Sequence, residues 1–245
     1  MYSVKDIEDI CSKYLEENGV SSFYNCGAVN YAGSSEGLKY TEIVAGFVLD
    51  NIKEFDNIKS ICREKNGRSY NSKHNGKYNS KSTRKEELDA IIMFNQCRKS
   101  VEQSVGDIGC VIDYQIPLKN EQRDKAGKID LLSQKDNTVY ILELKKYNSH
   151  ESLLRCVLEG YTYLKTVEKA KEKLLTDFSL DCDDIKDLKT APLVFDKGYP
   201  YRDYIELKEN KRPKLKELMK VWGVDHIFVC DKSSGKYTTK KMIIE

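Results

Sequence analysis

The stretch from Gly127 to Lys146, GKIDLLSQKDNTVYILELKK, constrains the fold of this chain more than any other part of the sequence. It contains two apolar runs rich in β-branched residues, 128–134 and 138–145, and a short polar segment lies between them. Short apolar runs bounded by Asp and Asn residues are typical of two paired antiparallel strands. We therefore predict a β-hairpin with Asp136 and Asn137 in its turn.

This hairpin sets which side chains face one another. With a two-residue turn, Lys135 pairs with Thr138, and counting back along both strands places Asp130 directly opposite Glu143. Directly opposed Cβ atoms lie about 4.5–5.5 Å apart, close enough for two carboxylates to hold one divalent cation. Lys145 lies two residues beyond Glu143 and therefore on the same face. We expect these three charged groups to converge among apolar neighbours, where charges are costly unless they are paired or bound to a metal.

The pattern of Asp130 followed by Glu143-Leu144-Lys145 resembles the PD-(D/E)xK, or restriction-endonuclease-like, nuclease superfamily. The resemblance implies that Asp130 and Glu143 bind Mg²⁺, or Mn²⁺ as a substitute, and that Lys145 orients or activates the attacking water. Ile129 stands where the name motif has proline. The alternative is a half-exposed strand pair in which Asp130 and Lys145 form a salt bridge.

A helix is predicted to begin at Ser82-Thr83, because a Ser or Thr cap is followed three residues later by a glutamate. The resemblance implies that a helix before the core strands supplies one more glutamate near the metal. We assign this catalytic role to Glu86 and keep Glu87 in reserve. The alternative is that both carboxylates only complement the positive end of the helix.

After the hairpin, Asn148-Ser149 is predicted to cap a long helix, roughly residues 150–175, whose apolar stripe should cover the sheet. The resemblance implies that polar residues of this helix support the metal site or contact the scissile phosphate. Arg155 is then the phosphate contact, and Glu159 and Tyr161 support the site from behind, Glu159 as a partner of Lys145. The alternatives are a surface ion pair between Arg155 and Glu159 and a packing role for Tyr161.

Residues 1–80 are interpreted as a helical extension, with helices predicted at 3–17 and 36–56. A segment at 59–85 follows, with nine basic residues and one acidic residue. Its lysines and arginines can neutralise phosphates and its tyrosines can stack on unpaired bases, so we expect Lys81 and Arg84 to bind substrate. The alternative is a flexible, solvated linker.

Residues 81–245 are predicted to form the nuclease-like domain. Further strands are expected at 108–116, 189–196 and 225–230, with a helix at 207–222. Strand, helix, strand, helix, strand in succession favours parallel pairing after the hairpin. The fold class is therefore α/β, with a central mixed sheet flanked by helices, a restriction-endonuclease-like core and a helical N-terminal extension.

Composition sets wider limits. Of the residues, 33% are charged, but the net charge is only +2, which leaves a nucleic-acid ligand open because the local distribution of charge matters more. The eight cysteines include no Cys-x-x-Cys pair, so neither a zinc site nor a compact disulfide framework is expected. The segment 1–20 carries many charges and no apolar run approaches membrane-spanning length, so we expect a cytoplasmic protein without membrane contact.

The function expected from these features is Mg²⁺-dependent hydrolysis of nucleic acid, most of all DNA, in bacterial defence or DNA repair, with an endonuclease favoured over an exonuclease. The sequence leaves open whether the protein forms a homodimer. One alternative is a catalytically inactive nuclease fold that binds nucleic acid or a protein partner. Another is an RNA-directed defence nuclease in which the N-terminal extension acts as the sensor.

Overall fold

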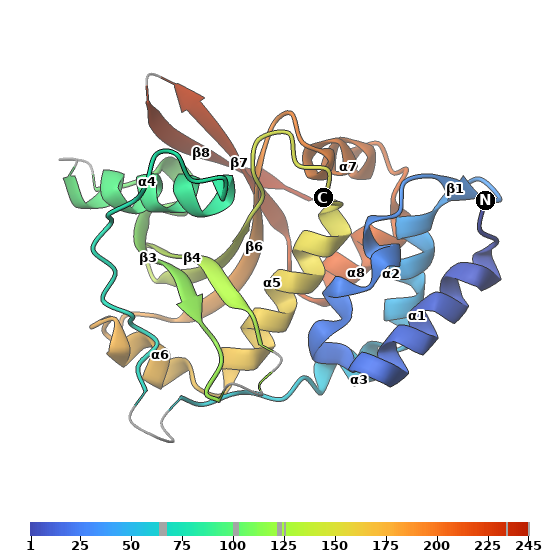
Figure 1. Ribbon diagram of the computed structural model, residues 1–245, viewed down its shortest axis with the longest axis horizontal. Helices are drawn as coiled ribbons and strands as arrows, with labels where there is room; N and C mark the ends of the chain where they lie inside the picture. Colours follow the sequence, from blue (N-terminus) through green and yellow to red (C-terminus); the bar gives the residue numbers. More distant parts are fainter. Residues whose placement is uncertain (64–67, 100–102, 122–123, 125, 234, 245) are drawn as a thin grey trace.

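A mixed six-stranded sheet flanked by helices forms the centre of the molecule, in an α/β arrangement (Figure 1). The computed structural model describes residues 1–63, 68–99, 103–121, 124, 126–233 and 235–244. The strands of the sheet, in spatial order, are β3 (Cys110–Pro117), β4 (Lys128–Lys135), β5 (Thr138–Leu144), β6 (Asp187–Phe195), β7 (His226–Ser233) and β8 (Lys236–Ile243). Two short strands, β1 (Ser34–Ser35) and β2 (Leu38–Lys39), pair separately.

The pairing changes from antiparallel to parallel at β5. Strands β3, β4 and β5 form an antiparallel meander, β5, β6 and β7 run parallel, and β8 returns antiparallel to β7. The mixed sheet and its flanking helices are as predicted from the sequence. Strand β8 is not among the predicted strands, because exposed lysines alternate there with a buried tyrosine and buried threonine, and such an edge strand lacks a strong apolar run.

Several of the predicted helices are divided into shorter ones. The helices in the described ranges are α1 (Val4–Asn18), α2 (Tyr40–Asp50), α3 (Ile52–Asp56), α4 (Lys85–Lys99), α5 (Leu153–Glu168), α6 (Lys171–Asp177), α7 (Tyr199–Lys208) and α8 (Pro213–Val221). Three 3₁₀ turns lie at Val20–Asn25, Gly27–Asn30 and Gly106–Ile108. The helix predicted at 36–56 is divided at Asn51, whose side chain donates to the Phe47 carbonyl. The helix predicted at 207–222 is replaced by α7 and α8, since Pro213 starts a new helix.

The helix predicted at 150–175 is also two helices. It ends at Glu168, and α6 follows after Ala170. The N-terminal cap is Ser152, whose hydroxyl accepts from the Arg155 amide at 3.0 Å, and not Asn148-Ser149 as predicted. By contrast, the helix predicted at 3–17 is confirmed with Ser3 as its cap, in a full capping box with Asp6.

Two hydrophobic clusters cover the two faces of the sheet. One joins the side chains of α1, α2 and α5 to Ile129 and Ile141, and the other joins those of α4 to Leu131 and Leu142. Figure 1 shows the blue N-terminal helices against α5 and α8, and α4 at the other end of the molecule. The boundary predicted near residue 80 therefore does not separate two cores, because the N-terminal helices share one of them with the sheet.

The basic segment 59–85 packs against the body of the protein in its described part. Tyr70 is fully buried and its hydroxyl donates to the Ile61 carbonyl at 2.7 Å. Arg63 is also buried and donates to the carbonyls of Ser69 and Pro117. Lys65 lies outside the described residues. This segment is thus anchored by buried side chains and is more than a solvated linker.

No helix in the described ranges combines the length and the apolar character needed to cross a bilayer.

Candidate active site

The predicted hairpin register is confirmed. Strands β4 and β5 pair Lys135 with Thr138 and Leu131 with Leu142, which makes Asp130 and Glu143 the next opposed positions. The turn works because Asp136 adopts a left-handed conformation, with φ 53°, that Asp tolerates better than most residues. Local turn chemistry therefore places two carboxylates on one face of the sheet.

Asp130 is held by two hydrogen bonds. Its Oδ1 accepts from Gln115 Nε2 at 2.8 Å, and its Oδ2 accepts from the Leu144 amide at 3.1 Å. Burial raises the pKa of the Asp130 carboxyl to about 7, although the nearby Lys145 opposes the shift. Burial and the neighbouring Asp130 likewise raise the pKa of Glu143 well above its usual value. Each carboxylate is thus costly to ionise while the site holds no added cation.

Lys145 stands at the centre of several carboxylates. Its Nζ lies 2.6 Å from Glu143 Oε1, 2.8 Å from Glu151 Oε2 and 3.3 Å from Glu159 Oε2. Burial disfavours the charged amine, but Glu143 and Glu159 more than offset this and hold the pKa of Lys145 well above its usual value. We call Asp130, Glu143, Glu151, Glu159 and Lys145 the carboxylate cluster.

Glu86 lies beside this cluster. It lies in the first turn of α4, and its Oε1 accepts from the Lys146 amide at 3.1 Å, just after β5. Its negative charge is one of the causes of the raised pKa of Asp130. Glu87, the reserve candidate, instead forms an exposed pair with Arg84 at 3.3 Å. The structure thus brings Glu86, and not Glu87, to the predicted site.

Arg155, on α5, contacts two carboxylates of the cluster. Its Nε lies 3.4 Å from Glu151 Oε2 and 3.7 Å from Glu159 Oε2. Its Nη1 donates to the carbonyl of Tyr24 at 3.1 Å, so it also ties α5 to the N-terminal segment. Arg155 thereby links Glu151 and Glu159 to the N-terminal segment, and its expected contact with the scissile phosphate stays a prediction. Glu159 contacts Lys145, as the resemblance implies.

Tyr161 is not placed at the cluster, which corrects its expected supporting role. Its hydroxyl donates to Asp56 at 2.6 Å and its ring stacks on Trp222 with the ring centres 3.9 Å apart, so it packs α5 against α3 and α8. The supporting tyrosine is Tyr163, whose hydroxyl donates to Glu159 Oε1 at 2.8 Å. The reason is that Tyr163 lies one helical turn beyond Glu159 and hence on the same helix face.

Sequence reasoning missed Tyr163 and Glu151. The spacing of Glu151 and Arg155, four residues apart, was the available signal for Glu151, but it becomes informative only when the helix is known to start at Ser152. Lys81 and Arg84, the predicted substrate contacts, are exposed just before and at the start of α4. Arg84 lines a surface pocket of about 310 Å³ that also includes Tyr78.

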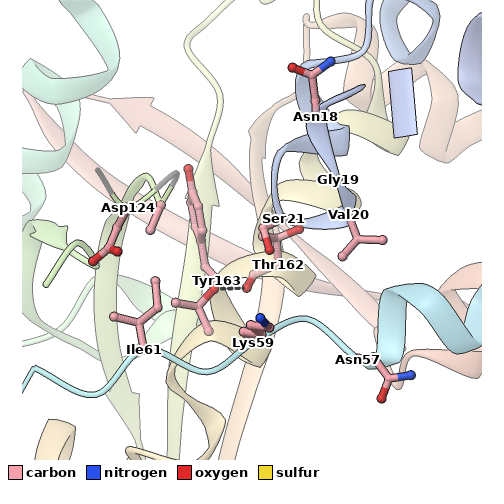
Figure 2. A pocket seen from close by; sticks show the side chains of 12 residues that line it. Asn18, Gly19, Val20, Ser21, Asn57, Lys59, Ile61, Asp124, Thr162 and Tyr163 are labelled. Atoms are coloured by element: carbon pink, nitrogen blue, oxygen red, sulfur yellow. Dashed lines mark hydrogen bonds between the residues drawn. The ribbon is translucent and has the colours of Figure 1, made fainter. Parts of the chain in front are cut away.

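Tyr163 lines one side of a cavity of about 380 Å³ (Figure 2). Figure 2 shows Tyr163 between Asp124 on one side and Ser21 and Val20 on the other. A Cβ atom on Gly127 would come within 2.2 Å of the Tyr163 hydroxyl. A side chain at position 127, just before β4, would therefore displace the Tyr163 ring from its present place.

The side chains fit a divalent cation in donor type and charge. Glu143 Oε2 is buried and lacks a hydrogen-bond partner among the described residues, so it is a free oxygen ligand. The four carboxyl groups of the cluster and that of Glu86 make five acidic groups against two cationic side chains, Lys145 and Arg155. In the described part of the chain, however, no three acidic, cysteine or histidine side chains are already gathered closely enough to hold a metal. A cation bound by Asp130 and Glu143 would need substrate or water oxygens to complete its shell, which is ordinary for Mg²⁺.

No family model matches the chain, and the comparisons with curated proteins and with solved structures gave no match either.

Proposed function

We propose that this protein is a Mg²⁺-dependent nuclease, with Mn²⁺ able to replace Mg²⁺, that hydrolyses phosphodiester bonds of nucleic acid, DNA first among the candidates. The observation that carries the proposal is the gathering of carboxyl groups around the buried Lys145, with Glu143 and Glu159 buried beside it and Asp130 at the position opposite Glu143. Uncompensated buried charge is destabilising, and a site that accepts this cost usually serves binding or catalysis.

The order of the elements supports the same proposal. Helix α4, strands β3 to β5, helices α5 and α6 and strand β6 follow one another as helix, three strands, two helices and strand. This order resembles the restriction-endonuclease-like core. The cluster lies on the middle hairpin of this unit, with Glu86 supplied by the preceding helix and Glu159 by the following one.

Each residue then has a defined task. Asp130 and Glu143 would hold the cation, which when bound polarises a phosphoryl oxygen and lowers the pKa of a water molecule. Lys145 can donate to that water and offset negative charge that develops on the phosphate. Arg155 and Tyr163 position Glu159, and Glu159 in turn keeps the Lys145 amine beside Glu143.

The decisive experiment is a digestion of plasmid DNA, linear duplex DNA, single-stranded DNA and RNA in parallel, with Mg²⁺, with Mn²⁺ or with a chelator. The wild type should cleave at least one substrate only when the metal is present. Lys145→Ala and Asp130→Ala should each lower the rate by about 100-fold or more, since each removes a group that acts on the transition state. Equal activity in the wild type and Lys145→Ala would refute the mechanism.

A second candidate is a catalytically inactive nuclease fold that binds nucleic acid or a protein partner. It is favoured by the ion pairs that surround Lys145 and by the lack of a preformed metal group among the described side chains. Titration with Mn²⁺ separates the two: an active site should bind the metal and lose this binding in Asp130→Ala. Cleavage of RNA alone in the substrate panel would instead favour the RNA-directed defence nuclease.

A further inference from the structure

Two loops meet at the edge of the sheet that carries the carboxylate cluster. The loop after β5 begins with Lys145, and the loop after β6 leads into Tyr199. Because β5 and β6 are parallel, their carboxyl ends lie at the same edge. The Tyr199 amide donates to the Ser149 carbonyl at 2.8 Å, so the two loops are in direct contact. Ligands of such sheets commonly bind outside the carboxyl ends of the strands.

Each of these loops presents an exposed tyrosine. Tyr147 is 48% exposed and Tyr199 is 42% exposed. In the described ranges, the other aromatic side chains exposed to this degree are Tyr2 and Tyr78. Tyr147 follows the cluster lysine by two residues, and Tyr199 lies at the start of α7. Phe195 packs edge-on against the Tyr147 ring and His150 lies against the Tyr199 ring, and the part of each ring that remains in water is available to a ligand.

A cation accompanies each ring. Lys197 Nζ lies 5.9 Å from the centre of the Tyr147 ring, and the guanidinium of Arg202 lies 5.1 Å from the centre of the Tyr199 ring. Lys197 and Arg202 are themselves exposed. We call Tyr147, Tyr199, Lys197 and Arg202 the tyrosine rim. Rings that stack on bases, interleaved with cations that contact phosphates, are how proteins bind single strands.

We propose that the tyrosine rim is a stacking platform for unpaired bases, so that single-stranded or locally unpaired nucleic acid is the substrate class of this protein. The inference rests on the proposed function for the role of the adjoining cluster. In an intact duplex the bases stack on one another and offer no free face to Tyr147 or Tyr199. An unpaired strand can place a base on each ring while Lys197 and Arg202 neutralise the flanking phosphates.

Binding is measured by fluorescence anisotropy in a chelator, so that no cleavage occurs. The probes are end-labelled oligothymidine, end-labelled oligouridine and a mixed-sequence DNA duplex of the same length. The wild type should bind a single strand about tenfold or more tightly than the duplex. The Tyr147→Ala/Tyr199→Ala variant should lose on the order of tenfold or more in single-strand affinity, as expected when base stacking on a ring is removed. The preferred single strand then distinguishes DNA from RNA.

A control variant sharpens the test. Tyr147→Phe/Tyr199→Phe keeps both rings and should bind single strands like the wild type. Equal binding of duplex and single strands, or unchanged binding by the double alanine variant, would overturn the platform. Single-strand binding that depends on the two rings, in a wild type that cleaves nothing with metal, would support the platform and refute only the proposed nuclease activity.

Discussion

At the scale of single residues, the carboxylate cluster lowers the stability of the folded protein, because its buried carboxyl groups are costly to ionise. Burial raises the pKa of Asp130 to about 7 and also raises that of Glu143. Burial acts on Glu159 in the same sense, but contact with Lys145 helps to outweigh it and holds the pKa of Glu159 below its usual value. The surroundings thus shift the pKa values of neighbouring carboxyl groups in opposite directions. Such divergence is typical of sites that bind cations or move protons.

Glu143→Gln should stabilise the metal-free protein. The substitution removes a carboxyl group that burial makes costly to ionise, while the remaining oxygen can still accept from Lys145, so we expect a gain of about 1–2 kcal/mol, or a Tm higher by about 2–8 °C. Glu143 has a raised folded-state pKa, so its penalty applies above the unfolded-state value of about 4.3 and disappears as the pH falls toward it. The gain in Tm should shrink accordingly in acid.

Calorimetry at several pH values checks this expectation. Mg²⁺ should raise the Tm of the wild type and leave that of Glu143→Gln unchanged, because binding to the folded state alone stabilises it. Glu172→Gln, at an exposed position of α6, is the matched control and should behave like the wild type. A lower Tm for Glu143→Gln without metal would contradict the view that this carboxylate is destabilising.

Tyr163→Phe and Tyr161→Phe form a second, matched test on one helix. Each removes a hydroxyl that donates to a carboxylate, Glu159 in one case and Asp56 in the other, so each should lose about 1–3 kcal/mol of stability. Only Tyr163→Phe should also weaken Mn²⁺ binding, since Glu159 contacts Lys145 and Asp56 does not belong to the carboxylate cluster. Titration calorimetry with Mn²⁺ measures the difference. Weaker metal binding in Tyr161→Phe would restore the supporting role that the resemblance implies for that residue.

At the scale of elements, the start of α5 decides where Glu151 and Arg155 stand. The Ser152 hydroxyl caps the helix at the Arg155 amide, and the same oxygen donates to the Val29 carbonyl. The Ser152 amide donates in turn to Asn30 Oδ1 at 2.9 Å. The cap is therefore joined to the N-terminal segment, and a contact distant in the sequence selects Ser152 over Ser149.

Ser152→Ala should cost about 1–2 kcal/mol, the usual loss for an N-cap serine. Ser149→Ala should cost distinctly less, because the Ser149 hydroxyl only accepts from the Glu151 amide at 3.3 Å within its own loop. Chemical denaturation followed by circular dichroism compares the two variants. A larger loss from Ser149→Ala would mean that the helix begins where the sequence pattern placed it.

At the scale of the whole molecule, the N-terminal helices are held to the sheet domain by a buried charge network as well as by a shared core. Arg212 is fully buried before α8, and its guanidinium lies 3.2 Å from Glu42 on α2 and 2.5 Å from Asp203 on α7. The carboxylate of Glu42 also accepts from the Lys214 and Leu215 amides. The Arg212 side chain thus joins a helix from the N-terminal part of the chain, α2, to one from the C-terminal part, α7.

Arg212→Met should therefore lower stability by about 3–5 kcal/mol, because Glu42 and Asp203 would be left buried without their cation. Lys211→Met is the matched control: this neighbouring lysine is exposed and pairs with Glu209 at the surface, where solvent screens the ion pair, so its loss should change stability little. Urea denaturation of both variants gives the comparison. A loss of less than about 1 kcal/mol in Arg212→Met would show that the network does not hold the two ends together.

Some features of this protein followed from the sequence alone, because they depend on neighbours along the chain. The turn at Asp136 and the alternation on either side determine the register that opposes Asp130 and Glu143. The Ser3 cap likewise determines where α1 begins. The α/β class was predictable for the same reason, since periodicity and turn chemistry are local.

Only the tertiary structure decided the rest. Three residue assignments depend on a partner distant in the sequence or on the packing of α5. Glu86 and not Glu87 lies at the cluster, Tyr163 and not Tyr161 contacts Glu159, and Ser152 and not Ser149 caps α5. The division of the long predicted helices and the pairing of β8 have the same origin. The periodicity of a segment indicates which face of a helix or strand is apolar. The hydrogen-bond partner of each polar side chain is decided only when separate elements come into contact.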